Sequence, residues 1–116
     1  MQTTLTGAEE VPGPGDPDGS GTARLTVNPG QEQVCYELVA TDIAATTGAH
    51  IHVASAGAAG PVVVALVPPD ASGESAGCTA VSRELALAII QNPELYYVNV
   101  HTVEYSAGAV RGQLGD

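Results

Sequence analysis

The sequence predicts an all-β domain: a Greek-key β-sandwich or flattened barrel of about eight strands with one short helix. Ala and Val supply most of the apolar residues, whereas Phe and Trp are absent, and β-branched residues suit pleated sheets better than helices. The 14 Gly and 8 Pro divide the chain into short segments. Several of these segments alternate apolar and polar residues with the period of a strand.

The N-terminal part of the chain predicts a short edge strand, a loop and a hairpin. Thr3 and Leu5 open the edge strand, and the Gly- and Pro-rich residues 11–21 form the loop. Residues 22–27 alternate, with Ala, Leu and Val on one face, and residues 33–41 alternate in the same way after the turn at Asn-Pro-Gly. Two such runs joined by a turn are typical of a β-hairpin.

The rest of the chain predicts further strands and one helix, in a single domain over residues 1–116. Ser82 is placed to cap a helix over residues 82–91, Glu84 suits its first turn, and Pro93 ends it nearby. The remaining expected strands span 49–53, 62–66, 75–80, 96–103 and 109–114.

The charge of the chain excludes two classes of partner. Three Arg and no Lys stand against 13 acidic residues, giving a net charge of −10. A nucleic-acid-binding protein needs cationic side chains to displace counterions from phosphate, and an anionic membrane surface attracts basic segments. No apolar run is long enough to insert into a membrane.

Cys35 and Cys78 are the only cysteines. Two distant cysteines in a small, acidic domain without Lys favour one disulfide and an exported protein; two buried free thiols in a cytosolic protein are the alternative. Met1 leads directly into strand-like residues, without a signal peptide. We therefore expect a secreted or extracytoplasmic mature domain whose targeting segment has been removed.

The three histidines carry the strongest functional signal. His50 and His52 are separated by one residue in an expected strand, so their side chains share a face, with Cα atoms roughly 6.5–7 Å apart. Two imidazoles at that spacing can turn toward one metal ion, at about 2.0–2.1 Å for each Zn–N bond. Ile51 between them faces the core.

His101 follows the same pattern in residues 96–103. Val98 and Val100 take the core face there, and His101 lies on the opposite, outer face, so outer-face imidazoles should be reachable from solvent. If the two strands are neighbours, the three histidines converge. Imidazole ligands favour copper, with zinc as the second choice, over calcium or magnesium. Three unrelated surface histidines are the alternative.

Three further residues are candidates for supporting this site. Tyr97 and Asn99 share the face of His101 and are placed to orient an imidazole, although ordinary packing explains them equally well. Arg111 either pairs with a carboxylate or attracts an anion toward the metal. Catalytic motifs are lacking: there is no G-x-S-x-G elbow, and Glu9 and Glu10 alternate in facing, so no catalytic residue is nominated and an enzyme is not favoured.

Taken together, several segments resemble the CHRD (chordin) domain family, of the free-standing microbial type, from Leu5 to Leu114. The resemblance implies an exported β-sandwich, which in chordin belongs to an extracellular antagonist of growth factors. The family's A-H-I-H and N-V-H motifs fall on His50, His52 and His101, while Val53 stands where many members carry Gly. The segments are LTGAEEVP (5–12), GSGTA (19–23), AHIH (49–52), GPVVV (60–64), YVNVHT (97–102) and GAVRGQL (108–114).

A fainter similarity concerns the copper. Residues 48–52, Gly-Ala-His-Ile-His, look like the G-F-H-V-H copper-ligand strand of copper/zinc superoxide dismutase. That enzyme adds a long loop carrying a bridging His and zinc ligands, whereas residues 54–60 here are short and offer no ligand. The similarity supports a copper site but not dismutase activity.

Three functions follow in order of preference. The first is a secreted domain that holds one copper or zinc ion through His50, His52 and His101 for sequestration, delivery or sensing. The second is a copper redox enzyme of the superoxide dismutase type, although a net charge of −10 repels superoxide unless Arg111 reverses the field locally. The third is a metal-free extracellular module that binds a protein partner.

Overall fold

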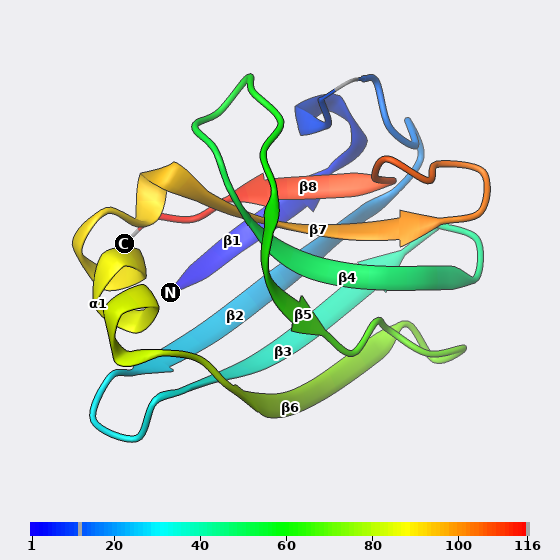
Figure 1. Cartoon of the computed structure of the whole chain (residues 1–116). Helices are drawn as coiled ribbons and strands as arrows, with labels where there is room; N and C mark the ends of the chain where they lie inside the picture. The colour runs from blue at the N-terminus through cyan, green and yellow to red at the C-terminus, as the bar shows by residue number, and fades with distance from the viewer. Residues whose placement is uncertain (12, 116) are drawn as a thin grey trace.

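The computed structural model describes residues 1–11 and 13–115, which form eight strands, one α-helix and two 3-10 helices (Figure 1). The elements are β1 (Gln2–Thr6), η1 (Gly7–Glu9), β2 (Ser20–Asn28), β3 (Gln33–Thr41), β4 (Thr46–Val53), β5 (Val62–Leu66), β6 (Glu74–Ala80), α1 (Arg83–Gln91), η2 (Pro93–Leu95), β7 (Tyr96–Thr102) and β8 (Val110–Gln113).

The strands form one antiparallel sheet in the order β5-β4-β7-β8-β1-β2-β3-β6, which curls into a nearly closed barrel. Hydrogen bonds connect Val67, directly after β5, with the other end of the sheet: the Ser75 hydroxyl of β6 donates to the Val67 carbonyl (2.6 Å), and the Val67 N–H donates to the Tyr36 hydroxyl of β3 (3.0 Å). The predicted all-β class is confirmed, in its barrel form. The strand opened by Thr3 is not at an edge, because β1 pairs with β2 on one side and β8 on the other.

Alternation of side chains accounts for the strands around the core. In β2, Ala23 and Leu25 are buried, whereas Arg24 and Thr26 are exposed. The predicted hairpin with β3 is present, and Leu38 of β3 is fully buried. Apolar side chains from every strand except β6 meet inside the barrel, where each buried Val or Leu contributes about 1.5–3 kcal/mol by leaving water.

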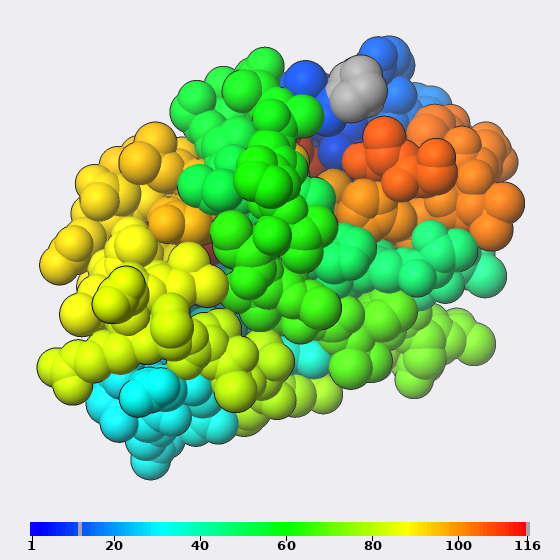
Figure 2. All heavy atoms as spheres, viewed as in Figure 1, coloured from blue at the N-terminus to red at the C-terminus, as the bar shows by residue number. Residues whose placement is uncertain are grey.

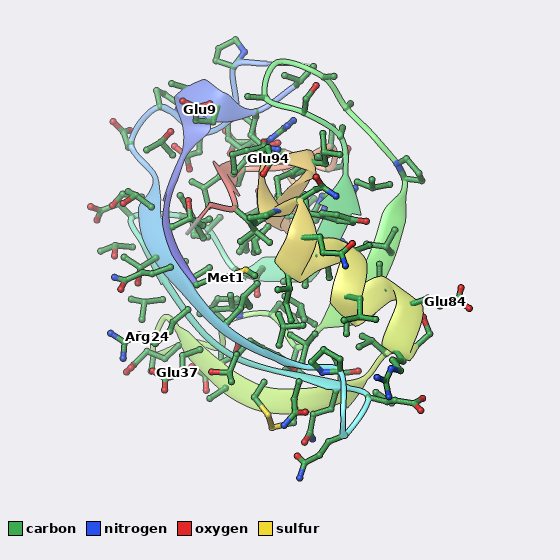
Figure 3. The ribbon with its side chains drawn as sticks, turned by 90° about the vertical axis from the view of Figure 1, so that its left-hand side faces the viewer. Met1, Glu9, Arg24, Glu37, Glu84 and Glu94 are labelled. Carbon is green, nitrogen blue, oxygen red and sulfur yellow. A yellow bond between two sulfur atoms is a disulfide. The ribbon has the colours of Figure 1, made fainter. Side chains whose placement is uncertain are left out.

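Helix α1 lies across one end of the barrel, as the end-on view of Figure 3 shows. The Ser82 side chain accepts a hydrogen bond from the Leu85 N–H (3.1 Å), so Ser82 caps the helix as the sequence predicts. Ala86 and Ile89 are fully buried and close the apolar core at that end. Within the described residues, no helix has the length and apolar character needed to cross a bilayer.

Cys35 and Cys78 form the expected disulfide. They lie directly opposite each other in the register of β3 and β6, so the bond fastens the last strand of the sheet to its neighbour. The closed loop has a sequence separation of 43 residues and carries β4 and β5. The disulfide therefore restricts the unfolded chain across the part of the sequence that includes His50 and His52.

Removal of this disulfide should destabilise the domain. A Cys35→Ala/Cys78→Ala variant should lose about 3–4 kcal/mol of the free energy of unfolding, because the loop-closure entropy of the unfolded chain returns. Guanidinium titration followed by far-UV circular dichroism measures the change, with the exposed Thr26→Ala variant on the adjacent strand as control. An unchanged midpoint would show that the disulfide does not support the fold.

Candidate metal centre

The register of β4 and β7 brings the three histidines together. His50 lies opposite Asn99, His52 opposite Tyr97, and His101 opposite Gly48. The two strands are neighbours in the sheet, which is the condition that the sequence left open. Gly48 leaves space between the imidazoles, since a side-chain carbon there would lie 3.2 Å from His50 Cε1.

The three imidazoles lie at distances suited to sharing one ion. Their ring centroids are 4.9 Å (His50–His101), 5.6 Å (His50–His52) and 6.0 Å (His52–His101) apart. One nitrogen from each ring lies within 4.8 Å of the others. Bonds of about 2.0–2.1 Å to one ion require nitrogen separations of about 3.4 Å, so small rotations of the rings would complete the site.

Hydrogen bonds fix the tautomers of two rings. His52 Nδ1 donates to the Gly60 carbonyl (2.8 Å), and His101 Nδ1 donates to the Ser106 carbonyl (2.9 Å), because a carbonyl oxygen only accepts. The Nε2 atoms of both rings therefore carry lone pairs. These two atoms and His50 Nδ1 are buried without a hydrogen-bond partner among the described residues, which fits the donor set of a metal ion.

The histidines are less open to solvent than the sequence predicts. The side chain of His52 is only 8% exposed, and His50 and His101 are partly buried. Desolvation lowers the pKa of His50, as do the nearby His101 and His52. Desolvation also lowers the pKa of His101, against the raising effect of its bond to Ser106. The neutral imidazoles that a metal requires are therefore favoured.

Residues 54–60, the loop between β4 and β5, cover part of the outer face of β7 and β8, and the Gly60 carbonyl contacts His52. In the space-filling view of Figure 2, this green segment lies at the top of the face, above β5. Arg111 donates to the carbonyls of Ala58 (2.7 Å) and Ser55 (3.1 Å) and to Gln113 Oε1 (3.0 Å). Gln113 Nε2 donates to the Ala54 carbonyl (2.7 Å).

Arg111 therefore has a different role from either of the two expected. It is 1% exposed, and its hydrogen bonds go to uncharged oxygens of the loop and of Gln113. The backbone of residues 55–58 lies far from Arg111 in the sequence and shows no periodicity, so sequence patterns cannot reveal these acceptors. The side chain fastens the loop instead of pairing with a carboxylate or facing open solvent.

Tyr97 connects Arg111 with the histidines. The Arg111 guanidinium carbon lies 3.4 Å from the centroid of the Tyr97 ring, a cation–π contact. The His52 ring stacks on Tyr97 with centroids 4.8 Å apart and planes 5° apart. The Tyr97 hydroxyl accepts a hydrogen bond from the Gly60 N–H (3.2 Å), and the carbonyl of the same residue accepts one from His52 Nδ1. Tyr97 thus contacts a candidate ligand directly.

Glu10 is a buried acid that sequence reasoning does not find. It is 4% exposed, and Gly108 makes room for its carboxyl group, since a side-chain carbon there would overlap it. Burial raises the pKa of Glu10 to about 7, against the lowering effects of the Arg111 charge and a hydrogen bond with Asn99. Glu9 is exposed, so the two acids do face differently, as expected.

These features define a class: an antiparallel β-barrel domain with a three-histidine cluster on the outer face of two neighbouring strands. The family model for the CHRD domain matches residues 1–114. The chain therefore belongs to the CHRD domain family, in agreement with the resemblance of its motifs. Searches of curated proteins and of solved structures gave no match.

The raised pKa of Glu10 predicts a stability that depends on pH. The folded state holds this proton up to a pKa of about 7, above the ordinary value of 4.5. The contribution of Glu10 to stability is therefore fully present below about pH 4.5 and is lost as the pH rises through about 7. Glu10→Gln should raise the free energy of unfolding at pH 8 by about 1–2 kcal/mol and leave it nearly unchanged at pH 4.

Urea unfolding at both pH values measures this difference. Glu9→Gln is the matched control, because it removes the same charge from the adjacent exposed position. Equal effects of the two substitutions at pH 8 would contradict a buried acid at Glu10.

Proposed function

We propose that this CHRD domain is an extracellular metal-binding module that holds one copper ion through His50, His52 and His101, with zinc as the alternative ion. The observation that carries the proposal is that each of the three histidines has a buried ring nitrogen without a hydrogen-bond partner among the described residues, and that one nitrogen of each ring lies within 4.8 Å of the others. Unpartnered buried polar atoms are costly, and one ion would satisfy all three together.

The chemistry of the donors supports this choice of ion. Three neutral imidazoles suit copper and zinc, whereas magnesium and calcium require oxygen ligands. Three protein ligands also leave a coordination position for water or an exogenous ligand, unlike a closed structural site with four ligands. An extracellular location is supported by the disulfide and by family membership.

Binding for sequestration, delivery or sensing fits the surroundings of the site better than rapid turnover does. Residues 54–60 contain only Ala, Ser and Gly, so this loop brings no side chain that could ligate a second metal. Arg111 is buried beneath that loop, which removes it from the path of an anion arriving from solvent. The metal-free interaction module remains the alternative that metal analysis tests.

Loss of two ligands should abolish stoichiometric binding. A His50→Ala/His101→Ala variant keeps only one imidazole, so its affinity for copper should fall by more than about 100-fold, the upper cost of losing a residue that merely hydrogen-bonds to a metal ligand. Isothermal titration of protein without a His tag measures this, with Thr22→Ala, an exposed position on β2, as control. Undiminished one-to-one binding by the double variant would remove the site.

The pH dependence of metal binding is an independent test of the same site. Protons compete with the metal for imidazole, and the pKa values of His50 and His101 lie below 6.5 because of desolvation. Affinity should therefore persist down to lower pH than for an exposed histidine and fall once the pH drops well below 6.5.

A superoxide assay separates the proposed role from the redox enzyme. The copper-loaded domain should remove superoxide no faster than a simple copper–peptide complex, and the rate should not respond to salt, because Arg111 is buried and does not guide the anion toward the site. Pulse radiolysis at two ionic strengths measures both quantities. A rate near the diffusion limit that slows with salt would favour the dismutase alternative.

A further inference from the structure

We infer that the three-histidine site is selective for the cuprous ion over the cupric ion, and that Arg111 is the residue that determines this selectivity. The inference rests on the proposed function, because it assumes that the site holds copper. It specifies the oxidation state of the bound copper ion, which the presence of three histidines alone does not.

The charge of the site favours the monovalent copper ion. All three donors are neutral imidazoles, so a bound Cu(I) gives a site charge of +1 and a bound Cu(II) gives +2. His52 is 8% exposed, and the three donor nitrogens are buried. The cost of moving a charge out of water rises steeply with its magnitude. A buried site without an anionic ligand therefore favours the monovalent ion, and it disfavours Zn(II) for the same reason.

The fixed positive charge of Arg111 also favours the monovalent ion. Its guanidinium remains protonated in proteins and is 1% exposed. Strands β4 and β8 flank β7 on opposite sides, so the Arg111 guanidinium and the His52 imidazole stack on opposite faces of Tyr97, at 3.4 Å and 4.8 Å from its centroid. A unit charge across one ring from the ligand repels a divalent ion more than a monovalent one.

The charges that oppose Arg111 are weaker. The negative charge of Glu10 would oppose that of Arg111, but this carboxyl group stays protonated up to a pKa of about 7. Glu104, Asp16 and Asp18 gather around Tyr105, which is not buried, and salt screens charges in solvent within about 8 Å at physiological ionic strength. Below about pH 7, where Glu10 is protonated, the buried cation therefore dominates locally, despite the net charge of −10.

The hydrogen bonds that hold the histidine rings disfavour the coordination geometry of Cu(II). The bonds of His52 to Gly60 and of His101 to Ser106 fix two imidazole rings. Cu(II) favours a tetragonal arrangement, which would require these rings to move and a further donor to enter. Three convergent nitrogens suit trigonal Cu(I) after only small rotations of the rings, and no further donor is needed.

Competition titrations test the selectivity. Anaerobic bicinchoninate competition gives the affinity for Cu(I) with ascorbate as reductant, and nitrilotriacetate competition gives the affinity for Cu(II). The ratio of the two affinities should be at least about tenfold higher for the protein than for a small copper–imidazole complex measured in the same way. For the one-electron couple, each tenfold change in this ratio corresponds to about 59 mV.

Variants separate charge from geometry. Arg111→Gln should lower the ratio by about tenfold or more, whereas Arg111→Lys, which retains the charge, should preserve most of it. Arg83→Gln is the control, because it removes the same charge from the exposed start of α1. Glu10→Gln leaves the bonds of Arg111 to the loop in place and should raise the ratio at pH 8, where it removes a negative charge.

The outcomes are distinguishable. Failure to bind either ion would refute the proposed function itself. Binding of both ions with the ratio of the imidazole complex would overturn the inference and leave the proposed function intact. An equal loss in Arg111→Gln and Arg111→Lys would also overturn it, because the effect would then come from the position of the loop. If Arg111→Gln does not fold, the wild-type ratio and the Glu10→Gln variant still decide.

Discussion

The antiparallel register between β4 and β7 is the constraint on which the rest of the site depends. Ile51 lies opposite Val98, and both are buried in the barrel core, which places their neighbours His50 and His52 on the outer face. A shift of one residue would exchange the two faces of a strand. Burial of apolar side chains inside the barrel therefore fixes the position of the imidazoles outside it, and the core needs no polar group to do so.

The outer face of these strands is a second packed layer and not a solvated surface. Arg111 and Gln113 bind carbonyl oxygens of residues 54–58, and Tyr97 lies between Arg111 and His52. This arrangement gives the loop fixed backbone partners and gives His52 a fixed ring orientation. The same contacts that shape the site thus set its electrostatic environment.

The sequence predicts well what depends on local pattern. Alternation identifies β2 and β3, and Ser82 marks the start of α1. The spacing of His50 and His52 places both on one face, although their neighbour His101 depends on a strand pairing that the sequence does not reveal. The covering loop has no periodicity, because its stability comes from backbone carbonyls that accept from Arg111 and Gln113.

Glu10 shows the same limit from another direction. Its burial depends on Gly15 and Gly108, which lie apart in the sequence and leave room for the carboxyl group only when the chain is folded. A dipeptide Glu-Glu at the start of a loop is typical of a solvated segment, and nothing in its composition distinguishes the buried acid from its exposed neighbour. Contacts between distant segments, and not propensity, decide which of the two acids is buried.

The most direct test of a shared ion is nitrogen NMR of ¹⁵N-histidine-labelled protein during titration with a diamagnetic ion, Cu(I) or Zn(II). We expect that Nδ1 of His50 and Nε2 of His52 and His101 shift together and saturate at one equivalent, while Nδ1 of His52 and His101 keep their protons. Shifts confined to one ring, or coordination through the Nδ1 atoms now bound to Gly60 and Ser106, would contradict it.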